Sequence, residues 1–291
     1  MALLRYLQLD VFAPRPGTGN PLGAILDADA LSSSQMQALA AWLNLSETVF
    51  FLRPTAPGAD YHIRIFTPTR ELAFAGHPSV GAAWAAVTCG LAQPRDGALL
   101  QQCAAGLLPV RVSGPAGALE IQLASPPARQ LDTEAGGAPA ALLALAADGQ
   151  VPELWDNGAR WWLLPLRDAD AVRSLLPDMA ALADWSLATD ATGVAVFADE
   201  AGAGHARVVR AFCPADAPSV PEDPVTGSAN ALIGAWLTQH GALSDGGGRF
   251  VASQGREVGR DGRVQVQVDA QGTVWIGGQV QPVIDGHIRW L

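Results

Sequence analysis

The sequence of 291 residues contains little cysteine and little positive charge. Its three cysteines, Cys89, Cys103 and Cys213, are widely spaced and form no Cys-X-X-Cys pair, which argues against a disulfide framework and is typical of a reducing compartment. The formal net charge is −10, and the 18 Lys and Arg residues form no basic run, so the sequence does not favour a nucleic-acid partner. No His-Glu-X-X-His motif occurs, and we expect no metal site.

The sequence also has no long apolar run. None approaches the ~18 residues of a membrane span, and the first ten residues alternate like a strand instead of forming a signal peptide. We therefore expect a cytoplasmic protein without a membrane partner. Apolar residues nevertheless make up 49% of the chain, and this content together with the length predicts two domains with cores of their own.

Two segments of the sequence, 66–79 and 212–230, resemble each other. Each runs from an apolar strand through Phe-X-Pro to a pair of glycine and a polar residue, and then into an alanine-rich helix with a tryptophan. The elements before them also recur in the same order in the two halves. This pattern predicts an internal duplication at the scale of a domain.

Each half consists mostly of strands and contains one very apolar helix, which we expect to be buried on all sides. This order differs from the alternating β-α-β pattern of a doubly wound sheet. The periodicity predicts helices at 31–43, 78–89, 175–185 and 228–239. It predicts strands at 6–12, 22–26, 61–66, 107–112, 119–123, 161–166, 208–212, 264–268 and 274–276.

The pairs Gly76-His77 and Gly227-Ser228 open the two buried helices. The N–H groups of a first helical turn are unpaired and lie at the positive end of the helix dipole, where a carboxylate or a developing enolate is stabilised. Because the pair occurs twice, we expect both corners to hold one ligand. The alternative is ordinary helix capping, for which Ser228 has a suitable side chain.

Three further side chains are candidates for chemistry. Glu47 enters an apolar strand, where partial desolvation favours the neutral carboxyl and makes it a usable proton donor and acceptor. Asp223 precedes a proline beside the second pair and would orient a substrate amine or hydroxyl, and His77 would donate to a substrate carboxylate. The alternatives are a solvated or capping Glu47, a turn aspartate and a structural histidine.

The motifs Asn44-Leu-Ser-Glu-Thr, Glu71-Leu-Ala-Phe-Ala-Gly-His-Pro and Glu222-Asp-Pro-Val-Thr-Gly-Ser-Ala occur in this order along the chain. With them the sequence resembles the PhzF-like isomerases of phenazine biosynthesis, which share the diaminopimelate-epimerase fold. The resemblance covers nearly the whole chain. It implies an α+β protein of two pseudo-symmetric domains, each a curved, mostly antiparallel, barrel-like sheet around a central helix, with the active site in the inter-domain cleft.

The resemblance also implies domain limits and roles for residues. We expect an N-terminal domain of residues 1–125, to which a C-terminal strand at about 279–291 is added, and a C-terminal domain of 126–278. Glu47 would be the catalytic acid and base. The substrate-binding residues would be Gly76, His77, Asp223, Gly227 and Ser228.

Related epimerases carry two cysteines at the corners where this chain has His77 and Ser228, so we do not expect a two-thiol racemase mechanism. The segment Gly259-Arg260-Asp261 departs from the Gly-Arg-Pro-Ser-like pattern of the family. We therefore assign no role to Arg260 or to the loop 253–263.

These observations predict a cofactor-independent isomerase or epimerase that moves a proton on carbon of a small carboxylate-bearing metabolite. Two other functions stay open: a non-catalytic binding protein of the same fold, and a hydrolase that uses Ser228. No Gly-X-Ser-X-Gly motif accompanies that serine. A homodimer is compatible with the resemblance. The sequence names neither the substrate nor the choice between isomerisation and epimerisation.

Overall fold

A computed structural model describes residues 2–115, 117–134, 136–202, 204–215, 221–243 and 248–290. The chain divides into an N-terminal unit, Met1–Ala124 with Gly277–Leu291, and a C-terminal unit, Ser125–Ile276. None of the helices in these described ranges is long and apolar enough to span a bilayer.

The N-terminal unit is built mainly of strands. Its elements are β1 (Ala2–Val11), β2 (Asn20–Ile25), η1 (Ala28–Ala30), α1 (Ser33–Leu43), β3 (Glu47–Leu52), β4 (Tyr61–Phe66), β5 (Glu71–Leu72), α2 (Gly76–Thr88), β6 (Ala98–Cys103), β7 (Gly106–Ser113), β8 (Glu120–Ala124) and the larger part of β17 (Val274–Trp290).

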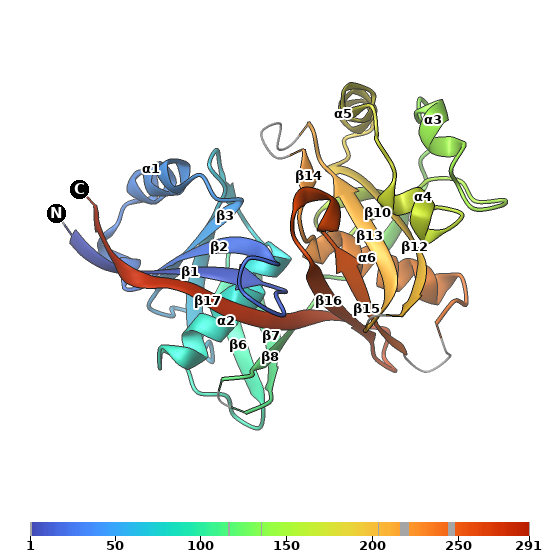
Figure 1. The fold of residues 1–291 in the computed structure, drawn as a ribbon. Coiled ribbons are helices and arrows are strands. Elements are labelled where there is room, and N and C mark those ends of the chain that lie inside the picture. The colour runs from blue at the N-terminus through green and yellow to red at the C-terminus, as the bar shows by residue number, and fades with distance from the viewer. Residues whose placement is uncertain are drawn as a thin grey trace. The chain divides into compact units, whose positions relative to one another are not determined.

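The strands of this unit close into a ring. Antiparallel pairs join β1 to β2, β3 to β4, β6 to β7 and β7 to β8, whereas β2 with β3 and β4 with β6 are parallel. β17 pairs with both β8 and β1 and completes the ring. Figure 1 shows β1 and β17 side by side over most of their length.

Helix α2 is buried within this ring. Ten of its thirteen residues are buried, and it packs against β1, β2, β3, β4 and β8. The fit is close, because a Cβ atom at Gly81 would lie 2.4 Å from Leu22 Cδ2. The prediction of a helix buried on all sides is therefore confirmed, and its small side chains reflect the narrow space inside the ring.

Helix α1 packs on the outside of the same strands. Ser32 and Gln35 form a capping box at its start. Its apolar residues Met36 and Leu39 are buried in a cluster that includes Phe50, which fixes α1 over β3.

The C-terminal unit repeats this organisation. Its elements are β9 (Arg129–Leu131), α3 (Ala140–Leu143), β10 (Glu153–Asp156), β11 (Arg160–Pro165), α4 (Ala169–Arg173), α5 (Met179–Ala188), β12 (Gly193–Gly202), β13 (His205–Phe212), β14 (Glu222–Asp223), α6 (Gly227–Gln239), β15 (Gly248–Gln254), η2 (Arg256–Val258), β16 (Gly262–Val268) and the start of β17.

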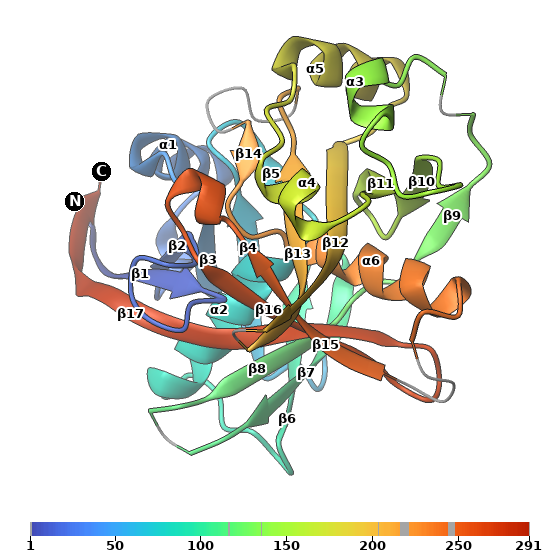
Figure 2. The same cartoon turned by 45° about the vertical axis from the view of Figure 1, so that its right-hand side comes forward.

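The pairing of the strands confirms the predicted pseudo-symmetry. β11 with β12 and β13 with β15 are parallel, and β12 with β13 and β15 with β16 are antiparallel. This is the order found for β2, β3, β4, β6 and β7. α6 takes the place of α2 and lies against β11 and β16 (Figure 2).

The helix predicted at 175–185 is wrong in its limits. Residues 169–173 form the separate short helix α4, and α5 begins only at Met179. Pro177 lacks an N–H group, and the Asp178 carboxylate accepts hydrogen bonds from the backbone N–H groups of Ala180 and Ala181. The proline and the aspartate therefore move the start of the helix toward the C-terminus.

One ion pair is duplicated together with the strands. Arg64 on β4 donates to both oxygens of Glu71, at 2.7 and 2.6 Å, and Arg210 on β13 donates to both oxygens of Glu222, at 2.9 and 2.8 Å. In each half this pair ties down the short strand that precedes the Gly-polar corner.

The duplication breaks where β3 and β12 begin. In the two parallel pairs, Glu47 lies opposite Leu22 and Gly193 lies opposite Trp161, so Gly193 occupies the position that corresponds to Glu47. A Cβ atom at Gly193 would lie 2.0 Å from the carbonyl oxygen of Phe212. No side chain fits there, and therefore no second carboxylate does.

We predict that Gly193→Ala destabilises the protein by roughly 2 kcal/mol, because a buried strand must shift to admit the methyl group. Gly286→Ala is the control, since a Cβ atom at that strand glycine meets nothing within 4 Å, and we expect no more than about 0.5 kcal/mol of change there. Equilibrium urea unfolding measures both variants. Equal stability of the two would contradict the steric explanation.

Candidate active site

The predicted site residues fall into two groups, one in each unit. Glu47, Gly76 and His77 form the N-terminal half-site, at the start of β3 and of α2. The second group, the C-terminal half-site, lies at the end of β14 and the start of α6 and consists of Asp223, Gly227 and Ser228.

Both central helices begin without a side-chain cap. The N-cap residue is Ala75 for α2 and Thr226 for α6, and neither makes a side-chain capping bond. The alternative that Ser228 caps its helix is therefore wrong, since it is the second residue of α6. No capping side chain competes with a ligand for the first-turn N–H groups at either corner.

In the N-terminal half-site, Glu47 and His77 meet. The Oε2 atom of Glu47 lies 3.2 Å from Nε2 of His77. The imidazole side chain is 6% exposed and the carboxyl 16%, so the contact is largely shielded from water. Parallel pairing of β2 with β3 brings the start of β3 to the ring position from which Glu47 reaches α2.

The contacts of His77 fix its tautomer. The ring makes a hydrogen bond with the backbone of Pro21, which has only a carbonyl to offer, so the ring nitrogen donates. Apart from Glu47, Nε2 has no partner among the described residues, which leaves Nδ1 as the donor. Burial lowers the pKa of His77 from 6.5 to about 3, so the ring is neutral near pH 7 and Nε2 carries a lone pair.

This tautomer of His77 determines which protonation state of Glu47 is favourable beside it. The unprotonated Nε2 of His77 lies 3.2 Å from an oxygen of Glu47, and two lone pairs at this distance repel each other. A proton on Glu47 removes the repulsion, because the carboxylic acid then donates to Nε2. This proximity makes Glu47 the candidate for proton transfer in the N-terminal half-site.

In the C-terminal half-site, the Asp223 carboxylate is held by its own loop. Its Oδ2 accepts a hydrogen bond from the hydroxyl of Thr226 at 2.8 Å, and its Oδ1 accepts one from the N–H of Val225 at 3.3 Å. The side chain is half-buried. Both oxygens are thus oriented by residues that immediately precede α6.

Ser228 is oriented by β11. The indole N–H of Trp161 donates to its Oγ at 3.0 Å, and the side-chain amide of Asn157 donates to its carbonyl oxygen at 3.1 Å. An indole only donates, so this contact leaves the serine hydroxyl with a hydrogen to give to a substrate oxygen. The structure therefore pairs Ser228 with Trp161, and the Asp223 carboxylate contacts Thr226.

Sequence reasoning missed Trp161, Asn157 and Thr226, and it missed Gln254, which is buried beside Thr226. Trp161 and Asn157 are separated in sequence from Ser228 by 67 and 71 residues, so no local motif contains the contact. The available signal for Gln254 was an amide side chain at the end of a predominantly apolar segment, where a buried polar group needs hydrogen-bond partners.

The described part of the chain contains no group of three or more His, Cys, Asp and Glu side chains that could hold a metal ion. A hollow of about 610 Å³ lies at β9 and β10, and its lining includes none of the predicted site residues.

The buried imidazole predicts a pH dependence of stability. Below pH 6.5 the unfolded chain binds a proton at His77, whereas the folded chain does not until about pH 3, so the free energy of unfolding falls as the pH drops through this window. From pH 7 to pH 5 the loss is about 2 kcal/mol in the wild type. We expect the His77→Gln variant to lack this pH-dependent loss of about 2 kcal/mol in the free energy of unfolding. Urea unfolding at both pH values measures it.

His62→Gln, which removes a partly exposed histidine on β4 of the same unit, is the control. It should keep the pH dependence of the wild type. If the His77→Gln variant lost as much stability between pH 7 and pH 5 as the wild type, the neutral buried ring would be refuted.

Comparisons with known proteins identify relatives of this chain. The chain matches the family model "Phenazine biosynthesis-like protein" over residues 9–286. It is 36% identical over 275 residues to trans-2,3-dihydro-3-hydroxyanthranilate isomerase of Pseudomonas aeruginosa, an alignment that covers 92% of this chain and 91% of that protein.

Solved structures show the same fold. The PhzF-family phenazine biosynthesis protein of Bacillus anthracis has a TM-score of 0.87 at 24% identity and covers 99% of this chain and 100% of its own. A hydroxyproline epimerase from Agrobacterium vitis has a TM-score of 0.65 at 14% identity and covers 99% and 91%. The chain therefore belongs to the phenazine biosynthesis-like (PhzC-PhzF) family of isomerases and epimerases, with a diaminopimelate-epimerase-like fold.

Proposed function

We propose that this chain is an isomerase that moves a proton on carbon of a small carboxylate-bearing metabolite, with Glu47 as the acid and base. The observation that carries the proposal is the 3.2 Å contact between Glu47 Oε2 and the unprotonated Nε2 of His77. Membership of a family of isomerases supports the reaction class.

The proton moves in two steps. In the first, a C–H bond of the substrate breaks, its proton forms an O–H bond with the Glu47 carboxylate, and the electron pair stays on the substrate in conjugation with its carboxylate. In the second, the acid returns the proton to another carbon or to the opposite face. His77 accepts the hydrogen bond of the acid and so stabilises the intermediate state of Glu47. No oxidant, reductant or co-reactant is needed.

The C-terminal half-site would bind the polar groups of a substrate. The hydroxyl of Ser228 and the first-turn N–H groups at Gly227 would bind the carboxylate and stabilise the charge that develops on it. Gly76 and its neighbours at the start of α2 would add the same kind of donor. Asp223, oriented by its own loop, would accept a hydrogen bond from a substrate amine or hydroxyl.

The substrate class follows from these donors and acceptors. The relative from Pseudomonas aeruginosa is named for trans-2,3-dihydro-3-hydroxyanthranilate, a compound that bears a carboxylate, an amine and a hydroxyl group. These are the groups for which the two half-sites have partners. This compound is therefore the first test substrate.

Two alternatives are separated by experiment. The Trp161 contact argues against a Ser228 nucleophile, because an N–H donor makes the serine oxygen less basic, and covalent labelling of Ser228 by a fluorophosphonate would reverse that conclusion. A binding protein without activity would bind the test compound and leave its C–H bonds unexchanged. A homodimer and a cytoplasmic location stay predictions.

We predict that Glu47→Gln lowers proton exchange by about 10²- to 10⁴-fold, because the amide keeps the shape of the side chain and cannot take up a proton. The measurement is deuterium incorporation from D₂O into trans-2,3-dihydro-3-hydroxyanthranilate, followed by NMR. Glu120→Gln, on β8 of the same unit, is the matched control and should exchange at the wild-type rate. Undiminished exchange by the Glu47→Gln variant would remove Glu47 from the mechanism, and no exchange by the folded wild type would contradict the reaction on this substrate class.

A further inference from the structure

Gln254, the last residue of β15, is buried beside the C-terminal half-site. Its side chain is 1% exposed, and its amide makes four hydrogen bonds, which is the full capacity of an amide group. All four bonds go to the segment 223–230. Its Oε1 accepts from the N–H of Thr226 at 3.1 Å and from the Asn230 amide at 2.9 Å, and its Nε2 donates to the Asp223 carbonyl and to the Thr226 hydroxyl, both at 2.9 Å.

One of these bonds is the first link of a directed chain of hydrogen bonds. The Nε2–H of Gln254 occupies the oxygen of the Thr226 hydroxyl, and that hydroxyl in turn donates to Oδ2 of Asp223 at 2.8 Å. Hydrogen bonds in such a chain polarise one another in a buried environment. The direction is fixed, because the amide only donates through Nε2 and the carboxylate only accepts. The chain therefore begins on a buried strand and ends on the predicted substrate-binding carboxylate.

The N-terminal unit contains a counterpart that ends differently. Gln101 on β6, which is 0% exposed, donates to Ser79 Oγ at 3.0 Å, and Ser79 donates to the carbonyl oxygen of Ala75 at 2.9 Å. Both glutamines lie on the strand that pairs in parallel with β4 or β13. The chain of hydrogen bonds from Gln101 ends at a backbone carbonyl, so it stabilises the start of α2 without reaching an acidic side chain.

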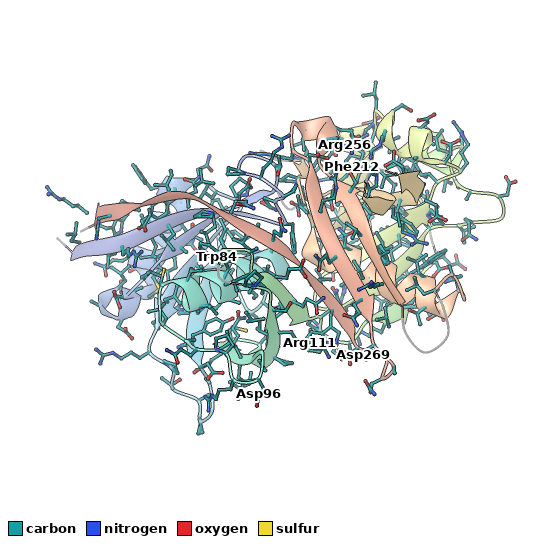
Figure 3. The ribbon with its side chains drawn as sticks, turned by 60° about the horizontal axis from the view of Figure 1, so that its bottom comes forward. Trp84, Asp96, Arg111, Phe212, Arg256 and Asp269 are labelled. Atoms are coloured by element: carbon teal, nitrogen blue, oxygen red, sulfur yellow. The ribbon has the colours of Figure 1, made fainter. Side chains whose placement is uncertain are left out.

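The loop that follows Gln254 keeps its amide in place. A Cβ atom at Gly255 would lie 2.4 Å from the carbonyl oxygen of Pro224, so the backbone after β15 approaches the backbone of the Asp223 loop closely. Arg256, labelled in Figure 3, then begins η2. Its guanidinium is paired with Asp261, which ties the loop to itself. The amide of Gln254 therefore has little freedom to turn away from the corner.

We propose that Gln254 is a positioning residue, which sets the orientation of the Asp223 carboxylate through the Thr226 hydroxyl and so controls how the substrate's amine or hydroxyl is held. This inference rests on the proposed function. A positioning role differs from a purely structural role in one respect. If Gln254 acts through Asp223, replacing Gln254 no longer changes the reaction rate once the Asp223 carboxylate has been removed.

The test is a double-mutant cycle on the deuterium-exchange reaction with trans-2,3-dihydro-3-hydroxyanthranilate. Gln254→Met keeps the length of the side chain and removes its hydrogen bonds, and we expect kcat/KM to fall about 10- to 100-fold. In the Asp223→Asn background the same change should cost less than about 2-fold, because members of one network are not additive.

Gln101→Met is the matched control, since it removes an equally buried amide from the equivalent strand. The fold-change in kcat/KM caused by Gln101→Met should be the same in the wild type and in the Asp223→Asn background. Thr226→Val breaks the chain at its middle and leaves the rest of Gln254 bonded, so it is the second test if Gln254→Met fails to fold. It should show the same lack of additivity with Asp223→Asn.

The outcomes separate this inference from the proposed function. Wild-type exchange by Asp223→Asn would remove Asp223 from the site and contradict the proposed function. A slow Asp223→Asn variant combined with wild-type rates for Gln254→Met and Thr226→Val would overturn only the role of Gln254. Effects of Gln254→Met that multiply with those of Asp223→Asn, as in the Gln101 control, would show a structural role instead and would overturn it as well.

Discussion

The contact between the Glu47 carboxyl and the His77 ring depends on the burial of α2 inside its ring of strands. Because the ring of strands excludes water from the start of α2, the imidazole of His77 stays neutral. Because Pro21 offers only a carbonyl, the Nδ1 atom of His77 carries the hydrogen. The other nitrogen is then an acceptor that lies 3.2 Å from a carboxyl oxygen of Glu47. A structural requirement, the packing of a narrow apolar helix, thereby sets the protonation state of the residue next to the proposed acid and base.

The two halves of the chain keep the same frame and differ at a few positions. Both retain the bidentate Arg–Glu pair, the uncapped central helix and a buried glutamine beside it. Glycine at 193 excludes a second carboxylate, since the carbonyl of Phe212 occupies the space that a side chain would need. One half therefore carries the proposed acid and base, while the other carries the donors and the carboxylate that we propose bind a substrate.

Much of the fold could be predicted from the sequence. The repeated strand-corner-helix pattern indicated an internal duplication, and the resemblance to the PhzF-like isomerases implied the pseudo-symmetric α+β fold. The nearly continuous apolar run in α2 indicated its burial. The limits of α5 were wrong, because the proline and the aspartate before it determine its start and the periodicity does not. The corner residues could be named because glycine followed by a polar residue at a buried helix start is recognisable in a sequence.

The hydrogen bonds that orient these residues could not be predicted. Trp161 and Gln254 come from strands distant in sequence, and only the closed pairing of those strands brings them to Ser228 and Thr226. The state of His77 also needed the structure, since it depends on burial and on the identity of one backbone acceptor. The alternative interpretation of Ser228 as a helix cap was wrong, because α6 begins at Gly227 and Thr226 is its N-cap.

The most direct test of the account is the ¹⁵N NMR spectrum of the His77 ring at pH 7, assigned by comparison with the His77→Gln variant. The expected result is a neutral ring with its hydrogen on Nδ1 and an unprotonated Nε2, whose chemical shift changes in a Glu47→Ala variant. A ring protonated on Nε2, or on both nitrogens, would contradict it.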